Sequence, residues 1–301
     1  VGNCGMTRDE WIEHFQLDVA ACATVDESYS SEVDRLVLAD SQVIFLKRPY
    51  TAEKWYRERG WIHALRGHVP VPEILAEAAP GQTTGAFVLA ALPGRAPVTM
   101  TKTLAYEIGR TLAQLHTCTG EAYGEYTEDG FYAYPVQDWR HFRSEKLEGF
   151  MPFITSALEP DFLESIEIEL ARREQLLPEP SRPVATHCDF RLANLLTEGE
   201  TVTGVIDFET TRYGAVEMDF TKIVRNLNEF GSMYVTAFQE GYATVHPHVP
   251  MQTYLEYYRL WEALTAVGWC VKRGLGEHRA FFEENIALIE QELKTSISDG
   301  Y

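Results

Sequence analysis

Four polar residues in the second half of the chain have types and a spacing that could do chemistry together. His187, Asp189 and Asn194 lie within eight residues, and Asp207 follows Asn194 by thirteen. Carboxylate and amide oxygens are ligands that Mg²⁺ accepts, and Mg²⁺ is usually held by one or two carboxylates together with substrate phosphates. Asn194 and Asp207 are therefore candidate magnesium ligands, and Asp189 is left to accept a proton.

Short apolar runs around these residues predict the elements that position them. Residues 184–186, 195–196 and 202–206 have the pattern of three strands, of which the last two are joined by a polar turn. The loop after the first strand then carries Asp189 and Asn194 at its two ends. Because Asp207 comes directly after the hairpin, we expect it to lie close to both.

This pattern resembles the catalytic centre of the aminoglycoside phosphotransferase and choline kinase family, whose members are related to protein kinases. The family motif is H-x-D-x-x-x-x-N followed by I-D, and here it is formed by His187, Asp189, Asn194 and Ile206-Asp207. The resemblance implies that Asp189 orients and deprotonates the acceptor hydroxyl. It also implies that Asn194 and Asp207 hold the Mg²⁺ ions that bridge the phosphates of ATP or GTP.

Two departures from protein kinase sequences favour the small-molecule branch of this fold. Cys188 stands where a protein kinase has the arginine of H-R-D, and Asp207-Phe208-Glu209 replaces D-F-G. A protein kinase regulated by phosphorylation of its activation loop is therefore the less favoured interpretation.

The first part of the chain resembles the small lobe of the same fold. The order strand, polar loop, strand, strand and helix is predicted at 23–25, 26–31, 33–38, 43–46 and 52–65. The resemblance places Lys47, at the end of the third strand, on the nucleotide phosphates. It makes Glu58 the partner of Lys47, with Glu53 as the alternative. Ser28, Ser30 and Ser31 in the polar loop are candidate phosphate contacts, although the loop has no glycine.

An apolar strand at 87–89 leads into Ala90-Ala91-Leu92-Pro93-Gly94, which resembles the hinge of the family. By this resemblance Leu89 is the gatekeeper, Ala90 offers its carbonyl to the adenine edge and Leu92 offers its N–H. We therefore expect an α+β, bilobal, protein-kinase-like fold. Residues 1–92 form a nucleotide-binding lobe with an antiparallel sheet and one helix, and 93–301 form a larger, mostly helical lobe that binds the acceptor.

The helical lobe is predicted from amphipathic segments. These segments lie at 104–116, 138–150, 161–177, 220–230, 232–242, 252–273 and 277–295, and 120–137 has the composition of a long surface loop. Asp219, just before one of these helices, is expected to brace the catalytic loop by hydrogen bonds.

Composition restricts the class of protein further. The formal net charge of −19 disfavours binding to a nucleic acid backbone, and no apolar run reaches the roughly 18 residues of a membrane span. Five cysteines without regular spacing favour reduced thiols and a cytoplasmic location. The sequence leaves the oligomeric state open.

The acceptor is predicted to be a cationic small molecule, most specifically an aminoglycoside-type antibiotic, which would make the chain a resistance enzyme. Residues 121–180 carry fourteen acidic and five basic residues. Strand-like alternation would turn Glu209 to the same side as Asp207, and Glu209 is the first candidate for an ammonium contact; Glu262 is the second. The alternatives are another acceptor (choline, homoserine, a sugar or a macrolide) and a non-catalytic kinase-fold protein that binds a ligand.

Overall fold

The computed structural model describes residues 5–25 and 30–298, and it divides into two compact units. The first unit comprises Val1–Tyr134, Pro183–Gly214 and Lys222–Pro247, and the second comprises Pro135–Arg182, Ala215–Thr221 and His248–Tyr301. Each unit is thus assembled from stretches that are far apart in the sequence. The predicted functional boundary between residues 92 and 93 divides the chain in another way and stays a prediction.

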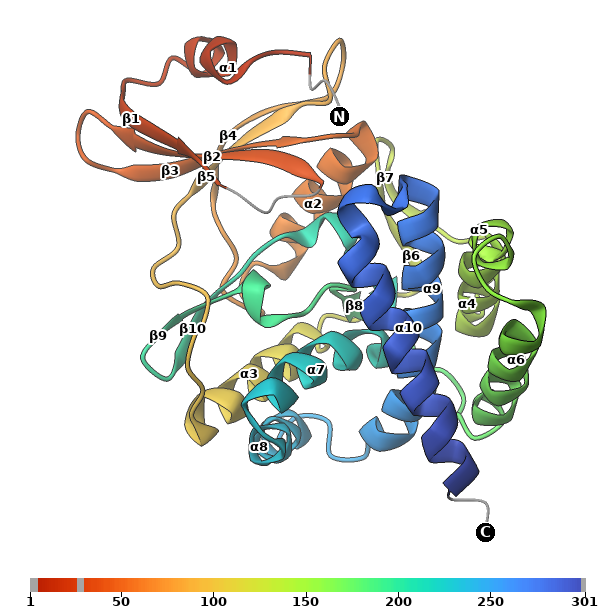
Figure 1. Ribbon diagram of the computed structural model, residues 1–301. Coiled ribbons are helices and arrows are strands. Elements are labelled where there is room, and N and C mark those ends of the chain that lie inside the picture. Colours follow the sequence, from red (N-terminus) through yellow and green to blue (C-terminus); the bar gives the residue numbers. More distant parts are fainter. Residues whose placement is uncertain (1–4, 26–29, 299–301) are drawn as a thin grey trace. The chain divides into compact units, whose positions relative to one another are not determined.

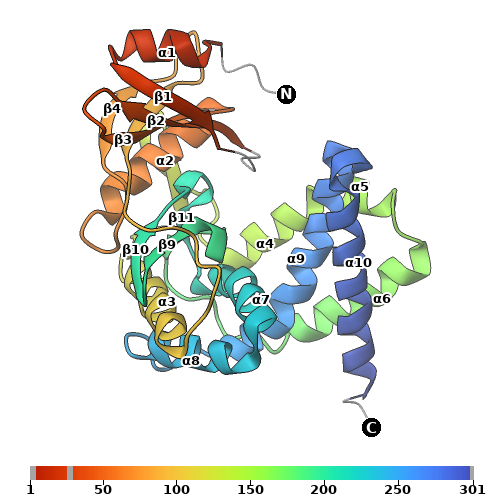
Figure 2. The same ribbon diagram turned by 60° about the vertical axis from the view of Figure 1, so that its left-hand side comes forward.

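A five-stranded antiparallel sheet begins the first unit, with the strand order β1-β2-β3-β5-β4 (Figure 1). Its strands are β1 Val19–Thr24, β2 Ser31–Leu38, β3 Val43–Pro49, β4 Ile74–Ala78 and β5 Ala86–Ala90. Helix α1 Arg8–His14 precedes the sheet, and helix α2 Ala52–Leu65 follows β3. In the view of Figure 2, α1 lies above the sheet and α2 below it.

Strand alternation explains which side chains face each helix. Ile44 and Leu46 of β3 share a buried cluster with Trp11 of α1. Because successive side chains of a strand point to opposite faces, Lys47 faces the other side, where α2 lies. On that side Trp55 of α2 stacks on Phe87 of β5 with ring centroids 5.1 Å apart.

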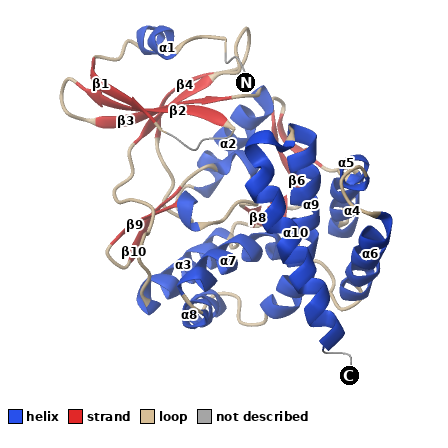
Figure 3. Cartoon of the chain, viewed as in Figure 1, coloured by secondary structure: helices blue, strands red, loops and turns tan. Residues whose placement is uncertain are grey.

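The remainder of the first unit carries the loop predicted to be catalytic. It contains a two-stranded sheet of β9 Leu195–Glu198 and β10 Thr201–Val205, and a four-stranded sheet in the order β7-β6-β11-β8. The latter consists of β6 Gly124–Thr127, β7 Gly130–Ala133, β8 Val184–Thr186 and β11 Arg212–Gly214. Short 3₁₀ turns lie at η1 Leu192–Asn194 and η2 Phe208–Thr210, and helices at α3 Lys102–Leu115, α7 Phe220–Phe230 and α8 Ser232–Ala243 (Figure 3). Helix α7 belongs to this unit from Lys222 on.

The segment after β5 is fastened to the β9–β10 hairpin. Arg95 and Thr197 exchange two backbone hydrogen bonds, and Thr203 Oγ1 donates to the carbonyl of Pro93. Gly94 between them has a φ of +91°, and a Cβ there would lie 2.5 Å from the carbonyl oxygen of Thr197. Glycine is therefore required where the hinge-like segment meets the hairpin.

The second unit is helical among its described residues. It contains α4 Trp139–Glu148, α5 Met151–Thr155, α6 Pro160–Glu174, η3 Val216–Asp219, α9 Met251–Arg273 and α10 Leu275–Ser298. Helix α9 is its core, with Tyr258, Leu260, Trp261 and Leu264 almost completely buried. No helix in the described parts of the chain is both long and apolar enough to cross a membrane.

The α+β architecture predicted from the sequence is confirmed, with antiparallel sheets early in the chain and mostly helices later. Two local predictions are wrong. The expected loop at 120–137 contains the hairpin β6–β7, with Gly130 at a φ of +98°. Residues 208–210 form a 3₁₀ turn instead of a strand, and Asp207 before them has a left-handed φ of 70°.

Candidate active site

A buried ion-pair cluster joins β3, α2 and the segment after β10. Lys47 Nζ lies 2.9 Å from Oε1 and 2.7 Å from Oε2 of Glu58, and 2.7 Å from Oδ1 of Asp207. Lys47 is only 6% exposed and Glu58 1% exposed. Of the two glutamates that the sequence left open, it is therefore Glu58 that pairs with Lys47.

The pKa values of these groups follow from burial and mutual attraction. Burial opposes the charged form of Lys47, but the carboxylates of Asp207 and Glu58 outweigh it and raise the lysine pKa. Burial also disfavours the charged form of Asp207, but Lys47 outweighs it and lowers the aspartate pKa. The pKa of Glu58 is raised, chiefly by burial and also by the nearby charge of Asp207, although Lys47 opposes this. An ionised lysine and an ionised aspartate therefore persist at neutral pH.

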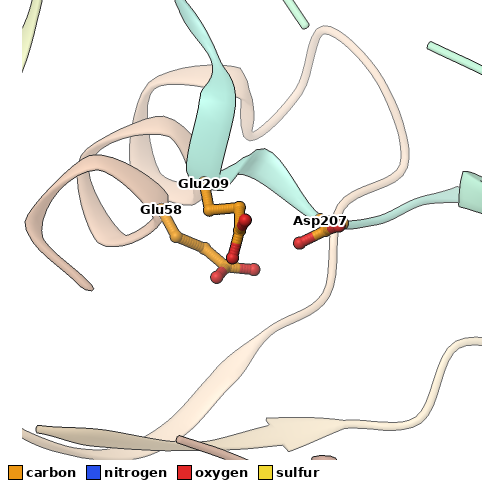
Figure 4. A group of neighbouring side chains, drawn as sticks. All are labelled: Glu58, Asp207 and Glu209. Atoms are coloured by element: carbon orange, nitrogen blue, oxygen red, sulfur yellow. The ribbon is translucent and has the colours of Figure 1, made fainter. Parts of the chain in front are cut away.

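Glu209 belongs to the same cluster. Glu58, Asp207 and Glu209 each bring a carboxylate oxygen within 4.8 Å of the others, and Figure 4 shows their side chains converging from α2 and from the segment after β10. Glu209 Oε1 pairs with Lys54 Nζ of α2 at 3.0 Å, and its backbone carbonyl accepts a hydrogen bond from Arg57 at 2.8 Å. Its Oε2 is buried and has no hydrogen-bond partner among the residues that the structure describes. The strand alternation from which the ammonium contact was predicted does not occur, although Glu209 still approaches Asp207.

His187 is a buried support of the catalytic loop. Its Nδ1 accepts from the backbone N–H of Asp189 at 3.3 Å, so its Nε2 carries the proton and donates to the carbonyl of Ile206 at 3.1 Å. The carbonyl of His187 accepts from Thr210 Oγ1 at 2.9 Å. The ring therefore ties the strand before the loop to the residue that precedes Asp207.

Asp189 is held by donors on both carboxylate oxygens. Oδ1 lies 2.7 Å from Nζ of Lys222, and Oδ2 accepts from Nδ2 of Asn194 at 2.9 Å and from Nε of Arg191 at 3.1 Å. Burial disfavours the carboxylate, but Lys222 and Arg191 outweigh it and lower the pKa of Asp189. The group is therefore an ionised acceptor at neutral pH.

The positions of Asn194 and Asp207 suit a hard cation. Because the amide nitrogen of Asn194 is bound to Asp189, its oxygen lies on the other side of the amide group. The backbone N–H of Ile206 donates to the carbonyl of Asn194 at 3.0 Å, which fixes Asp207 next to this asparagine. The carboxylate oxygens of Glu58, Asp207 and Glu209 lie within 4.8 Å of one another. Such oxygen donors fit a divalent cation.

The hinge-like segment begins at the end of β5, which lies between β3 and β4 in the five-stranded sheet. Leu89 pairs with Phe45 in the sheet and is buried, and Ala90 pairs with Ile44. The N–H of Ala90 donates to Glu73, whereas Leu92 lies beyond the end of β5 and is partly exposed. The carbonyl position at Ala90 and the N–H position at Leu92 stay predictions.

The serine-containing loop is described only in part. Ser28 lies outside the described residues, and Ser30 is partly buried. Ser31 is the first residue of β2, pairs with Pro49 and is 2% exposed. The roles of these serines stay predictions.

Two predicted residues lie in the second unit. Glu262 is partly exposed on α9 next to the buried Trp261, and Asp219 ends η3 and is 1% exposed. Their predicted roles, in acceptor binding and in bracing the loop, stay predictions.

The basic residues that hold the acidic ones were not predicted from the sequence, namely Lys54, Arg57, Arg191 and Lys222. Two of them carried a signal. Arg191 is two residues from Asp189, and Lys222 stands in the first turn of α7, where a cation is opposed by the helix dipole unless a partner holds it. Lys54 and Arg57 carried no local signal, since charged residues are ordinary on a helix.

Comparison with known proteins agrees with this geometry. Residues 26–257 match the model of the phosphotransferase enzyme family (APH), and the chain therefore belongs to that family. A search of the curated proteins found none that matches. Among solved structures, one neighbour is a thermostable mutant of the aminoglycoside phosphotransferase APH(4)-Ia in a ternary complex with AMP-PNP and hygromycin B. It has 16% identity and a TM-score of 0.71 over 95% of this chain and 98% of that one.

Two further neighbours have other acceptors or nucleotides in their names. A GDP complex of a mutant aminoglycoside 2'-phosphotransferase-IIIa has 13% identity and a TM-score of 0.69 over 96% of this chain and 97% of that one. A macrolide 2'-phosphotransferase from Brachybacterium faecium has 18% identity and a TM-score of 0.63 over 93% and 95%. At these identities the likeness shows the fold. Together with the family match it confirms the predicted class, a small-molecule phosphotransferase with the kinase-like fold.

Proposed function

We propose that this enzyme transfers the γ-phosphate of ATP or GTP to a hydroxyl group of a small molecule, and that its acceptor is an aminoglycoside-type antibiotic. The observation that supports this best is that the first unit contains two charged centres with the required groups. One is the ionised Asp189 on its loop, and the other is the Lys47–Asp207 pair. A phosphotransferase needs an acceptor-orienting carboxylate, a lysine for the phosphates and metal ligands. The candidates here are Asp189, Lys47 and the pair of Asn194 and Asp207, respectively.

Lys47 is the proposed phosphate contact on the nucleotide side. Its ammonium group is held by Glu58 at the end of a buried side chain, so it is positioned before a nucleotide binds. Ala90 would accept a hydrogen bond from the adenine or guanine edge through its carbonyl, and Leu92 would donate one through its N–H. The complexes of solved neighbours with AMP-PNP and GDP support a nucleotide site and leave both ATP and GTP in the proposal.

Asn194 and Asp207 would hold Mg²⁺ through oxygen atoms. When bound, Mg²⁺ would neutralise phosphate charge that develops during transfer. Asp207 is kept ionised by Lys47 and therefore presents a full negative charge to a cation. Asn194 also orients Asp189 through its amide nitrogen, so one residue links the proposed metal site with the proposed base.

Asp189 would accept a hydrogen bond from the acceptor hydroxyl and take its proton as the new P–O bond forms. Its lowered pKa makes it a weak base, which suits phosphoryl transfer through a loose transition state, because the hydroxyl proton is lost late. Orientation of the hydroxyl is then the larger part of its contribution.

An acceptor with several ammonium groups needs carboxylates near the hydroxyl that reacts. Glu262 and Glu209 remain the proposed contacts, and Glu209 is the weaker candidate because one of its oxygens already pairs with Lys54. The hygromycin B complex of a solved neighbour supports this class of acceptor. The macrolide phosphotransferase among the neighbours makes a macrolide the second candidate.

The cytoplasm, where thiols stay reduced, remains the proposed location.

A panel of acceptors tests the proposal directly. Aminoglycosides, macrolides, choline, homoserine and simple sugars are incubated with the enzyme, Mg²⁺ and ATP or GTP. Nucleotide consumption and the mass of the product are both recorded. We expect a phosphorylated aminoglycoside and acceptor-dependent nucleotide consumption. Phosphorylation of the macrolide alone would move the proposal to that class, and nucleotide binding without any product would indicate a non-catalytic binding protein.

A further inference from the structure

Helix α7 touches the catalytic loop through a residue that the family motif does not include. Lys222 Nζ lies 2.7 Å from Oδ1 of Asp189 and 3.0 Å from the carbonyl oxygen of Cys188. The lysine side chain is 35% exposed and the Asp189 side chain 21% exposed. A single ammonium group therefore binds both the proposed base and the backbone immediately before it.

A second side chain on the same face of α7 holds the other part of the loop. Asn226 follows Lys222 by four residues, so the two side chains lie one above the other on the helix. Asn226 Oδ1 accepts from the backbone N–H of Leu192, the residue that begins the 3₁₀ turn ending at Asn194. The helix thus fixes the loop on both sides of Asp189.

The loop needs such support because Cys188 adopts a left-handed conformation. Its φ is 62°, which is uncommon for a residue other than glycine, asparagine or aspartate. Its carbonyl points to Lys222 in this conformation, while the carbonyl of His187 accepts from Thr210. Loss of the ammonium group would remove the hydrogen bond from Lys222 to the carbonyl of this residue.

The position of Lys222 in its helix indicates a specific role. It is the third residue of α7, in the turn where the helix dipole opposes a positive charge. The contacts with Asp189 and Cys188 offset that cost. Lys102, which stands in the first turn of α3 and is exposed, offers a matched comparison.

We propose that Lys222 is a positioning residue for phosphoryl transfer, which holds the Asp189 carboxylate and the Cys188 carbonyl so that the acceptor hydroxyl is oriented. The proposal rests on the proposed function of Asp189. Asn194 and Arg191 restrain Oδ2, and Lys222 restrains Oδ1, so the plane of the carboxylate is fixed. A carboxylate oxygen has a second lone pair, and the acceptor hydroxyl can therefore donate to Asp189 without displacing Lys222.

The kinetic test compares Lys222→Met, Lys222→Arg and Lys102→Met. Acceptor phosphorylation, nucleotide affinity and nucleotide hydrolysis without acceptor are each measured. We expect Lys222→Met to lower kcat for the acceptor by about 10- to 100-fold, because small misplacements of a reacting group cost about that much. Nucleotide affinity and acceptor-independent hydrolysis should change less than about twofold, which is well below 1 kcal/mol. Lys222→Arg should restore part of the rate, and Lys102→Met should behave as the wild type.

A second readout needs no acceptor and separates this proposal from the proposed function. The alkylation rate of Cys188 is followed by mass spectrometry, with Asn226→Ala added as a variant that keeps the lysine. Lys222→Met and Asn226→Ala should each speed alkylation severalfold, and Lys102→Met should not. If alkylation is faster in these variants but the wild-type enzyme phosphorylates no acceptor, the positioning contact stands and the proposed function fails. If alkylation is unchanged, or if acceptor transfer and acceptor-independent hydrolysis fall in parallel, Lys222 does not position the loop.

Discussion

Lys54 Nζ lies 3.0 Å from Glu209 Oε1, and this ion pair connects α2 to the turn that follows Asp207. Arg57, three residues further along α2, binds the backbone carbonyl of the same glutamate. Helix α2 also carries Glu58, which reaches Asp207 through Lys47. The helix is therefore joined to the proposed metal-binding turn by two direct contacts, both to Glu209, and by a third that Lys47 relays. Glu209 thus has a structural role.

A double-mutant cycle separates these two roles of Glu209. If Glu209 acts through Lys54, Lys54→Met and Glu209→Gln should each raise KM for the magnesium–nucleotide complex severalfold. The double variant should be no worse than either single variant, because the two residues act as a unit. KM for the acceptor should stay constant. A rise in acceptor KM with Glu209→Gln alone would instead identify Glu209 as an ammonium contact.

Asp207→Asn should weaken magnesium-dependent nucleotide binding by about tenfold or more, corresponding to at least about 1.4 kcal/mol. A neutral amide offers a divalent cation much less than a carboxylate, and the variant also removes a charge that holds Lys47. Nucleotide affinity is titrated at several Mg²⁺ concentrations. Unchanged affinity and an unchanged Mg²⁺ requirement would show that Asp207 is not a ligand.

KM for a polycationic acceptor should rise steeply with salt. Partly exposed charge pairs are screened over about 8–10 Å near physiological ionic strength, whereas the buried Lys47 site is screened much less. KM values for acceptor and nucleotide are measured across a range of NaCl concentrations, with a neutral acceptor as control. An acceptor KM that ignores salt would favour a sugar or a macrolide.

Glu217 predicts a pH dependence of stability in the second unit. It is 2% exposed, and within the described parts of the chain its Oε2 has no hydrogen-bond partner. Burial raises its pKa to about 7, although Arg143 opposes this. Because the pKa of Glu217 is higher in the folded than in the unfolded state, its contribution to the free energy of unfolding is fully present below the unfolded pKa of about 4.3. That contribution is lost as pH rises through the folded pKa of about 7. The free energy of unfolding falls by at most about 3 to 4 kcal/mol through this ionisation.

The free energy of unfolding of Glu217→Gln, relative to that of the wild type, should therefore be higher at pH 8.5 than at pH 5.5, because the amide cannot ionise. Urea unfolding at both pH values measures the difference, and Glu164→Gln on the exposed face of α6 is the control. A relative stability of Glu217→Gln that is the same at both pH values would show that Glu217 does not ionise in this range.

The parts of the site that could be predicted are those encoded by neighbouring residues. The apolar runs of β8 and β10 are short and bounded by polar residues, so the positions of Asp189 and Asp207 after them were evident. Lys47 stands at the end of a short apolar run that a helical segment follows, but its assignment came from the resemblance to the family. The roles depended on the family motif, which composition and periodicity alone do not supply.

The parts that could not be predicted depend on tertiary contacts or local turns. Lys222 reaches Asp189 across 33 residues, and Lys54 reaches Glu209 across 155, distances over which spacing carries no information. The hairpin β6–β7 was missed because acidic residues are mixed with its tyrosines. Its Asp129-Gly130 pair, with the positive φ at the glycine, was the turn signal that could have identified it.

The most direct test of the proposed function is kcat for acceptor phosphorylation by Asp189→Asn. Asparagine keeps the size of the side chain but cannot take the hydroxyl proton, and the exposed Asp129→Asn serves as the matched control. With nucleotide affinity unchanged, we predict that kcat falls by about two to four orders of magnitude in Asp189→Asn only. Near-normal turnover by this variant would contradict the assignment of Asp189 as the residue that orients and deprotonates the acceptor.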